Sequence, residues 1–209
     1  MQPTVVDEPF DDPGYLFEPW WPGVRALAFV EGGSLRLDVG GLADASAAVP
    51  EMDELPGQLL DDAAVLDGTL LVLDSGGRPD AELLRRRLTA SAAPGGRRDG
   101  AAAYVASDLL WSDGRAWTRR PYRARRDRLQ AILPDGERAV VGRGYREDGM
   151  LVASALSLLG IDGMSARRLD ARYRAGVAGD AWLRVPLVPR LAADAEPRPT
   201  LALIQRLPL

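Results

Sequence analysis

The sequence has 209 residues, of which 46% are hydrophobic and 27% charged, with a formal net charge of −4 and a pI near 5.0. These values are typical of one sizeable globular domain, and an acidic chain is unlike proteins that coat nucleic acid. No apolar run approaches the roughly 20 residues of a membrane helix, and the acidic N-terminus lacks a signal-peptide pattern. We therefore expect a cytoplasmic protein without a membrane segment.

Four residue types are absent from the sequence: Cys, His, Lys and Asn. All 26 basic residues are therefore arginines. Without Cys and His, no Cys–His or Ser–His–Asp mechanism and no Cys/His zinc site can form. Without Lys, no side-chain amine can form a Schiff base or a phosphoramidate. The groups that remain for chemistry are carboxylates, Ser, Thr, Tyr and Arg.

The first half of the chain predicts mainly strands. Residues 24–30 and 34–39 are apolar runs on either side of Glu-Gly-Gly, a pattern typical of a β-hairpin. Residues 51–60 predict a short helix that Leu-Pro-Gly-Gln breaks. Residues 63–74 predict a buried hairpin or a long strand that turns near Asp67–Gly68.

The middle of the chain alternates helices with a loop and a strand. Asp80 is placed to cap the N-terminus of a helix with the sequence AELLRRRL. Residues 89–100 are small, polar and Gly-rich, which predicts a flexible loop. Residues 101–111 predict a strand, and residues 122–133 predict a helix with apolar side chains at helical spacing.

The last part of the chain adds one helix and two strands. Residues 148–160 predict an amphipathic helix that Gly160 ends, and GMSARRL and AWLRVPLV predict strands. Hairpins mixed with helices, rather than regular βαβ units, predict an α+β fold with antiparallel sheets. We expect one domain over residues 1–188 and a C-terminal tail over residues 189–209 that forms an added strand.

Arginines are concentrated from Arg115 to Arg128, where seven of them accompany one aspartate. This cluster is either a solvated helix face or a contact for a DNA backbone or an acidic partner. Residues 142–149 contain Gly-x-Gly, but they do not open a helix after a strand, so we do not expect a dinucleotide site.

Five segments between about residues 16 and 186 follow, in order, the motifs of one known family. They read FEPWWPGVRAL, VLDGTLLVLDSGGRPD, YVASDLLWSDGRAWTRRPYRARRDRL, GIDGMSARRLDARYRAG and AWLRVP. They are similar to E-P-K-x-D-G-x-R-A, to L-D-G-E-L-V, to F-D-L-L followed by D-G-R and P-Y-x-x-R-R, to G-x-E-G-x-x-x-K and to W-x-K-x-K. The chain thus resembles the adenylation (nucleotidyltransferase) domain of ATP-dependent DNA ligases, especially the bacterial end-joining kind. The resemblance implies that family's fold and its cofactors, ATP and Mg²⁺.

The differences from the family motifs fall on the positions that carry chemistry. In the family, a lysine attacks the α-phosphate of ATP and carries AMP, and the matching residue here is Trp20. An indole nitrogen donates a hydrogen bond but is not a nucleophile. The resemblance therefore implies no catalytic residue, no bound cofactor and a degenerate nucleotide pocket. The pocket positions that the resemblance assigns are Trp20, Pro22, Arg25, Thr69, Ser107, Asp162, Arg167 and Arg184.

Three groups of residues each have two interpretations. Trp20 and Trp21 either fill the vacated pocket as core or form a stacking platform for a new ligand. Three arginines are either solvated or ion-paired, or they form a residual anion site. Three aspartates either hold Mg²⁺, or they cap turns or pair with nearby arginines. The arginines are Arg25, Arg167 and Arg184, and the aspartates are Asp67, Asp108 and Asp162.

The sequence thus predicts a DNA ligase adenylation-domain-like protein that has lost ligase chemistry. We expect it to act as a binding or scaffold protein, for either a protein partner in DNA repair or end joining or a phosphate-bearing ligand. The alternatives are a noncovalent binder of ATP, another nucleotide or a DNA end, and an enzyme that uses the old pocket for other chemistry. Residues 187–209 are too few for the OB-fold domain that follows in the family, so we expect none.

Overall fold

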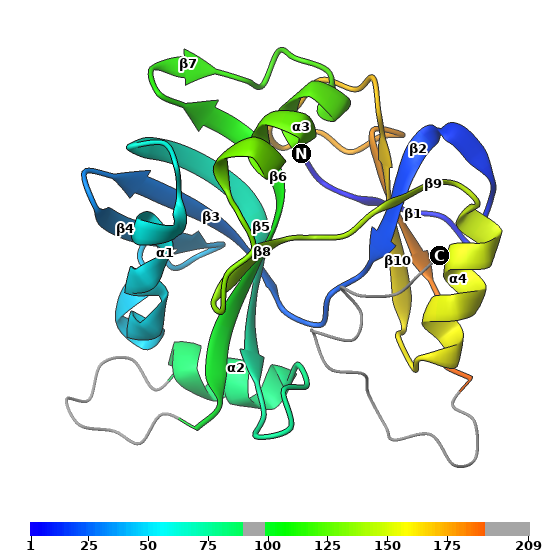
Figure 1. Ribbon diagram of the computed structural model, residues 1–209. Coiled ribbons are helices and arrows are strands. Elements are labelled where there is room, and N and C mark those ends of the chain that lie inside the picture. Colours follow the sequence, from blue (N-terminus) through cyan, green and yellow to red (C-terminus); the bar gives the residue numbers. More distant parts are fainter. Residues whose placement is uncertain (90–98, 191–209) are drawn as a thin grey trace. The chain divides into compact units, whose positions relative to one another are not determined.

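The computed structural model describes residues 1–89 and 99–190 (Figure 1). The predicted loop over 89–100 and the predicted tail over 189–209 therefore fall almost entirely outside the described residues. Two compact units make up the chain, each with its own sheet. Unit 1 comprises Met1–Trp21, Arg119–Arg123 and Gly142–Leu209, and unit 2 comprises Pro22–Thr118 and Ala124–Val141.

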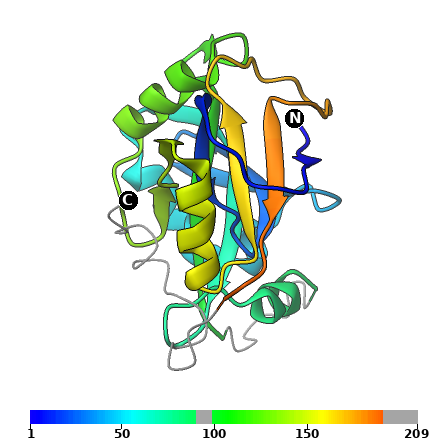
Figure 2. The ribbon, with the colours of Figure 1, turned by 90° about the vertical axis from the view of Figure 1, so that its right-hand side faces the viewer.

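Unit 1 is built on a five-stranded sheet in the order β1-β11-β10-β2-β9. β1 pairs with β11 in parallel, and the other neighbours are antiparallel. The helix α4 packs against this sheet through β2, β9 and β10 (Figure 2). The elements are β1 (Thr4–Val5), β2 (Asp12–Pro19), β9 (Tyr145–Glu147), α4 (Gly149–Leu158), β10 (Gly163–Arg168) and β11 (Trp182–Pro186).

The contact between α4 and β2 depends on a glycine and an aromatic cluster. A Cβ atom at Gly149 would collide with the Phe10 carbonyl oxygen and with the ring of Phe17, so α4 begins at a residue without a side chain. Phe10 packs edge-on against Phe17, with ring centroids 5.4 Å apart, and Phe17 is fully buried. The helix is followed by Gly160 at φ 74°, as its C-terminal glycine predicts.

Unit 2 contains a six-stranded sheet, in which β4-β3-β5-β6-β7 are antiparallel neighbours and β8 pairs with β6 in parallel (Figure 1). The core lies between this sheet and the helices that cover it. The strands are β3 (Val24–Glu31), β4 (Ser34–Val39), β5 (Ala63–Leu73), β6 (Ala101–Ser112), β7 (Arg115–Ala116) and β8 (Ala139–Val141). The helices are η1 (Ser46–Ala48), η2 (Pro50–Glu54), α1 (Leu55–Gln58), α2 (Ala81–Thr89) and α3 (Tyr122–Ile132), whose first two residues belong to unit 1.

The strand β5 corrects the expected hairpin or turn near Asp67–Gly68, because it runs without a break from Ala63 to Leu73. The Asp-Gly pair marks a register shift against β6 and not a turn. A Cβ atom at Gly68 would collide with the Val105 carbonyl oxygen on β6 and with the ring of Tyr104, so the close approach of the two strands requires glycine here.

Most predicted helices are confirmed, with two corrections. The Asp80 carboxylate accepts hydrogen bonds from the N–H groups of Glu82 and Leu83, so it caps α2 as predicted. The sequence Leu-Pro-Gly-Gln forms the short helix α1 instead of breaking one, because its proline occupies a position in the first turn. The outer face of α4 carries exposed apolar side chains, so this helix is not amphipathic.

The sequence did not predict β1, β2, β7, β8 or β9. Most of these strands have only two or three residues, too few for a period to be visible. β2 is different, because the stretch from Tyr15 to Pro19 is buried at every residue and therefore lacks the alternation expected of a half-buried strand. None of the helices in the described ranges is long and apolar enough to cross a membrane.

Candidate functional site

The eight residues predicted for the nucleotide pocket divide between the two units, and each group is described within its own unit. Unit 1 holds Trp20, Asp162, Arg167 and Arg184, and unit 2 holds Pro22, Arg25, Thr69 and Ser107.

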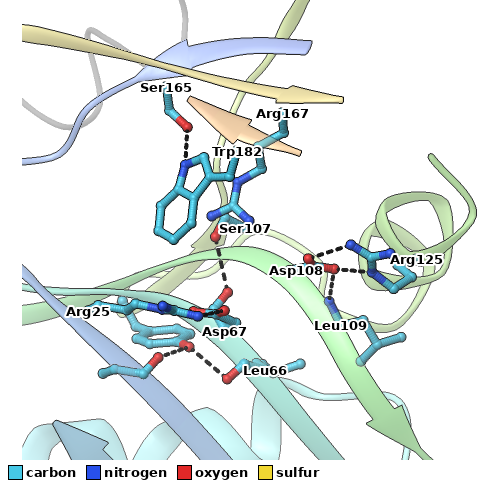
Figure 3. Close-up of polar contacts among 12 residues, drawn as sticks. Arg25, Leu66, Asp67, Ser107, Asp108, Leu109, Arg125, Ser165, Arg167 and Trp182 are labelled. Carbon is cyan, nitrogen blue, oxygen red and sulfur yellow. Dashed lines mark hydrogen bonds and ion pairs between the residues drawn. The ribbon is translucent and has the colours of Figure 1, made fainter. Parts of the chain in front are cut away.

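In unit 1, Trp20 lies directly after β2 and stacks on a second tryptophan. Its backbone N–H donates to the Gly163 carbonyl oxygen at 2.9 Å, and a Cβ atom on Gly163 would crowd the Trp20 side chain. The rings of Trp20 and Trp182 are 5.8 Å apart with an interplanar angle of 28°. The Trp182 indole N–H donates to the Ser165 hydroxyl at 2.9 Å (Figure 3). Trp182 is thus held at its indole N–H by Ser165 and on its ring face by Trp20.

Two arginines lie over the faces of these tryptophans. The guanidinium carbon of Arg184 is 4.7 Å from the Trp20 ring centroid, and that of Arg167 is 4.3 Å from the Trp182 centroid. Both distances are within the range of favourable cation–π contacts. We call the group formed by Trp20, Arg167, Trp182 and Arg184 the arginine–tryptophan cluster.

Within this cluster, the two arginines differ in their polar surroundings. Arg167 and Glu18 are both 5% exposed, and the Arg167 Nε lies 3.7 Å from a Glu18 carboxylate oxygen. The charge of Arg167 is therefore balanced inside unit 1. Arg184 is half-buried, and its Nε is buried without a hydrogen-bond partner among the described residues. The two arginines thus differ in their burial and in the carboxylate that lies beside Arg167.

The register of the strands explains how unit 1 assembles this cluster. On β10, Ser165 pairs with Arg184 of β11 and with Glu18 of β2, and Arg167 pairs with Trp182. Alternate residues of a strand face the same side of a sheet, so these side chains share one face. Sequence reasoning missed Glu18 and Ser165. A spacing of two residues places side chains on the same face of a strand, and it separates Glu18 from Trp20, Ser165 from Arg167, and Trp182 from Arg184, so this spacing was a usable signal.

In unit 2, Arg25 on β3 binds the carboxylate of Asp67 on β5 through two N–H groups (Figure 3). The two contacts measure 2.8 Å and 2.5 Å, and Asp67 is 1% exposed on its side chain. The Ser107 hydroxyl donates to the Asp67 carbonyl oxygen at 3.1 Å. Thr69 is the cross-strand partner of Arg25, and Pro22 is exposed. Arg25 is thus an ion-paired residue, as one of its two interpretations predicted.

A second carboxylate of unit 2 is bound in the same way. The Nε and Nη2 of Arg125 on α3 each donate to Asp108 on β6 at 2.7 Å, and both side chains are 0% exposed. The Leu109 N–H donates to the same carboxylate at 2.9 Å. Two N–H groups that meet two oxygens form the strongest kind of side-chain ion pair.

This pair corrects the interpretation of the arginine cluster as a solvated helix face. Arg125 and Arg126 are buried, and Arg128 binds the Asp61 carboxylate at 2.6 and 2.7 Å. The arginines that do face solvent are Arg115, Arg119, Arg120 and Arg123.

The structure offers no support for a metal site at the three predicted aspartates. Asp67 and Asp108 bind arginines, and Asp162 is exposed in unit 1. Over the described ranges, no three Asp, Glu, His or Cys residues are placed to hold a metal ion. The interpretation that these aspartates pair with arginine is confirmed for Asp67 and Asp108.

A cavity of about 430 Å³ in unit 1 lies away from the predicted pocket residues. Its lining includes the ion-paired residues Arg168, Asp170 and Asp180 and none of the eight pocket residues.

No family model matches the sequence. The end-joining protein LigD of Mycobacterium bovis is 31% identical over 170 residues, which are 81% of this chain and 21% of that protein. A DNA ligase of Natronomonas pharaonis is 32% identical over 173 residues, 80% of this chain and 31% of that protein. The crystal structure of the ligase domain of Mycobacterium tuberculosis LigD matches with a TM-score of 0.71 and 28% identity, over 86% of this chain and 58% of that one.

The α+β fold with two mainly antiparallel sheets is therefore that of the DNA ligase adenylation domain, as the sequence predicted. The chain belongs to the family of ATP-dependent DNA ligase adenylation domains, and LigD proteins are among its relatives. It spans about a fifth of the length of the LigD proteins that it matches.

Proposed function

We propose that this protein is an adenylation-domain-like member of the ligase family that does not transfer adenylate and that acts by binding in end-joining DNA repair. One observation carries the proposal. Trp20 stands where the resemblance places the nucleophilic lysine, and the chain contains no lysine at any other position. An indole N–H has no lone pair available to attack a phosphate.

The contacts of Trp20 support this proposal. Its ring is stacked on Trp182, and Arg184 lies over it, so the side chain is held by its neighbours and not presented as a reactive group. By the resemblance, the aromatic ring of Trp20 occupies the position at which the family carries the amine of its lysine. In this interpretation the Trp20 side chain packs within unit 1 and needs no ligand to cover it.

The carboxylates of unit 2 add a second argument. Metal-assisted phosphoryl transfer needs free carboxylates to hold Mg²⁺ and cations to clamp the phosphates. Asp67 and Asp108 are instead bound by Arg25 and Arg125. Both aspartates are committed to ion pairs that hold unit 2 together.

Binding would use the exposed arginines. Arg119, Arg120 and Arg123 are three exposed cations of unit 1 within five residues, suited to a phosphate backbone or an acidic protein surface. The names of the LigD relatives place them in non-homologous end joining. We infer that this chain serves the same repair process through contacts and not through catalysis.

The test of this proposal is a covalent labelling experiment. The protein is incubated with Mg²⁺ and ATP labelled at the α-phosphate, with the ligase domain of M. tuberculosis LigD as the positive control. We expect no labelled band after denaturing electrophoresis of this protein. A labelled band that survives denaturation would refute the proposal.

A second candidate function, noncovalent binding of a nucleotide or another phosphate-bearing ligand, is favoured by the surroundings of Arg184. Its buried Nε has no partner among the described residues, and its guanidinium lies beside the half-buried Trp20. Isothermal titration with ATP, AMP and nicked duplex DNA tests this candidate, with Arg184→Gln as the variant. We expect any measured affinity to fall in that variant, and an unchanged affinity would rule out this site.

A further inference from the structure

The helix α4 is apolar on the side that faces away from unit 1. Its inner side is buried through Val152, Ala153 and Leu156. Its outer side exposes large apolar side chains, although a helix that covers a sheet normally presents polar residues to solvent. These side chains are Met150, Leu151 and Leu158, which are 52%, 55% and 58% exposed.

The spacing on the outer side is that of a docking surface. Leu151, Ser154, Ala155 and Leu158 follow one another at intervals of three, one and three residues, so they form one stripe along the helix. Three of these four residues are apolar, and apolar side chains at this spacing match the contacts that a helix makes with a partner. The stripe carries no charged residue along its length.

The segment after β11 adds a fourth apolar side chain at the end of this stripe. The Leu187 N–H donates to the Asp162 carbonyl oxygen at 2.9 Å, and the Arg190 N–H donates to the Ser157 carbonyl oxygen at 2.7 Å. These bonds fix the chain on both sides of Val188, which is 77% exposed. We call Met150, Leu151, Leu158 and Val188 the α4 apolar face.

Four of the eight large hydrophobic residues that are exposed in the described ranges belong to the α4 apolar face. Scattered apolar residues on a surface need no explanation, but a group of them on one helix marks an interaction site. The α4 apolar face therefore has the character of an interaction site, and the chain itself contains an apolar segment elsewhere in its sequence.

We propose that residues 200–207 of this chain, with the sequence TLALIQRL, bind the α4 apolar face. This segment has four large aliphatic residues and one charge, whereas residues 192–199 between it and Val188 are mainly Ala, Pro, Asp and Glu. The composition is that of a connector followed by a segment that gains from burial.

The geometry of the connection favours this occupant. Arg190, the residue before this connector, is bonded to Ser157 near the C-terminal end of α4. Nine residues span at most about 30 Å when fully extended. A helix with the 10 residues of α4 is about 15 Å long. The connector therefore reaches any point along the helix.

A second copy of the protein fits this face less well. Stable interfaces bury about 800 Å² on each partner, more than four partly exposed side chains supply. A segment of the same chain needs less area, because a short connector gives it an effective concentration in the millimolar range. A small apolar face thus favours binding of a segment of the same chain over binding of a second copy.

The absence of cysteine makes a clean test possible, because two introduced cysteines can only pair with each other. One cysteine replaces Ser154, which is exposed in the middle of the stripe, and the second replaces Gln205 or Ala202. A disulfide forms only when the two Cβ atoms come within about 4 Å. The matched control carries Ala43→Cys, an exposed position of unit 2, with the same second cysteine.

We expect the Ser154→Cys pairs to form an intramolecular disulfide in a yield roughly tenfold above that of the control, at micromolar protein and limiting oxidant. Adding Leu151→Glu and Leu158→Glu should lower the yield to the control value. Both leucines are more than half exposed, so these variants should keep their circular dichroism spectrum and melting temperature.

Three outcomes would overturn the proposal. The first is an equal yield for the Ser154→Cys pairs and the control. The second is a yield that the two glutamates leave unchanged in a folded protein. The third is a majority of disulfide-linked dimers at micromolar concentration, which would assign the α4 apolar face to a second copy of the chain.

Discussion

Units 1 and 2 both contain arginines within the segments that resemble the ligase motifs, but the two units place different groups beside them. In unit 2, Arg25 and Arg125 each bind a buried carboxylate through two N–H groups. In unit 1, Arg167 and Arg184 lie over tryptophan rings, and the contact of Arg167 with Glu18 is 3.7 Å long. Unit 2 thus uses its buried charges for stability, whereas in unit 1 the half-buried guanidinium of Arg184 lies beside the half-buried ring of Trp20.

The largest effect should come from the buried pair of unit 2. We expect Arg125→Ala to lower the free energy of unfolding by about 3–5 kcal/mol, because Asp108 would remain as an uncompensated buried charge. Urea unfolding measures the difference. Arg123→Ala on the same helix is the control, because that side chain is exposed and should change stability by less than about 0.5 kcal/mol. Similar losses of unfolding free energy in both variants would show that burial of the Arg125–Asp108 pair does not determine the cost of the substitution.

A smaller effect should come from the arginine–tryptophan cluster of unit 1. We expect Trp20→Ala to cost roughly 1–3 kcal/mol, since the ring is half-buried and loses both its stacking on Trp182 and its contact with Arg184. A double-mutant cycle with Arg184→Ala should give a coupling energy of about 0.5–1 kcal/mol. A coupling energy of zero would contradict a cation–π contact between the two side chains.

These two sites also show what the sequence does and does not reveal. The hairpin of β3 and β4 and the helix α3 were predictable, because a Gly-rich turn and a helical apolar period are local signals. The pair of Asp108 and Arg125 was not, because the period of α3 identifies its buried face but not the residue that a distant strand brings to it. The arginines of α3 therefore looked like a solvated row, although one of them is fully buried.

The errors have local causes as well. Asp67–Gly68 is a typical turn signal, yet Asp67 binds Arg25 and Gly68 makes room for the Val105 carbonyl oxygen, so both residues serve a continuous strand. In unit 1, the resemblance identified Trp20, Arg167 and Arg184 as neighbours of one family site. It did not identify Glu18 as the partner of Arg167, because that contact depends on the pairing of β2 with β10.

The smallest expected effects are opposite responses of the two units to pH. In unit 2, burial raises the pKa of Glu51, but the Ala102 N–H and the Arg87 guanidinium more than offset it, so the pKa lies below its usual value of 4.5. Stability from Glu51 is therefore complete above about pH 4.5 and is lost as the pH falls through the folded pKa. In unit 1, burial and the nearby Asp180 raise the pKa of Tyr15 above 10.0, so its contribution is complete below that pH and is lost as the pH rises through the folded pKa.

Two matched variants separate these responses. The stability difference between the native protein and Glu51→Gln should be on the order of 1 kcal/mol at pH 7 and should shrink in acid, because protonated Glu51 no longer pairs with Arg87. The difference between the native protein and Tyr15→Phe should stay constant in acid and shrink above about pH 10, where the native tyrosine ionises. Urea midpoints measured across both ranges provide the data. If acid reduced the Tyr15→Phe difference as much as the Glu51→Gln difference, the two units would not differ in the way their charges are held.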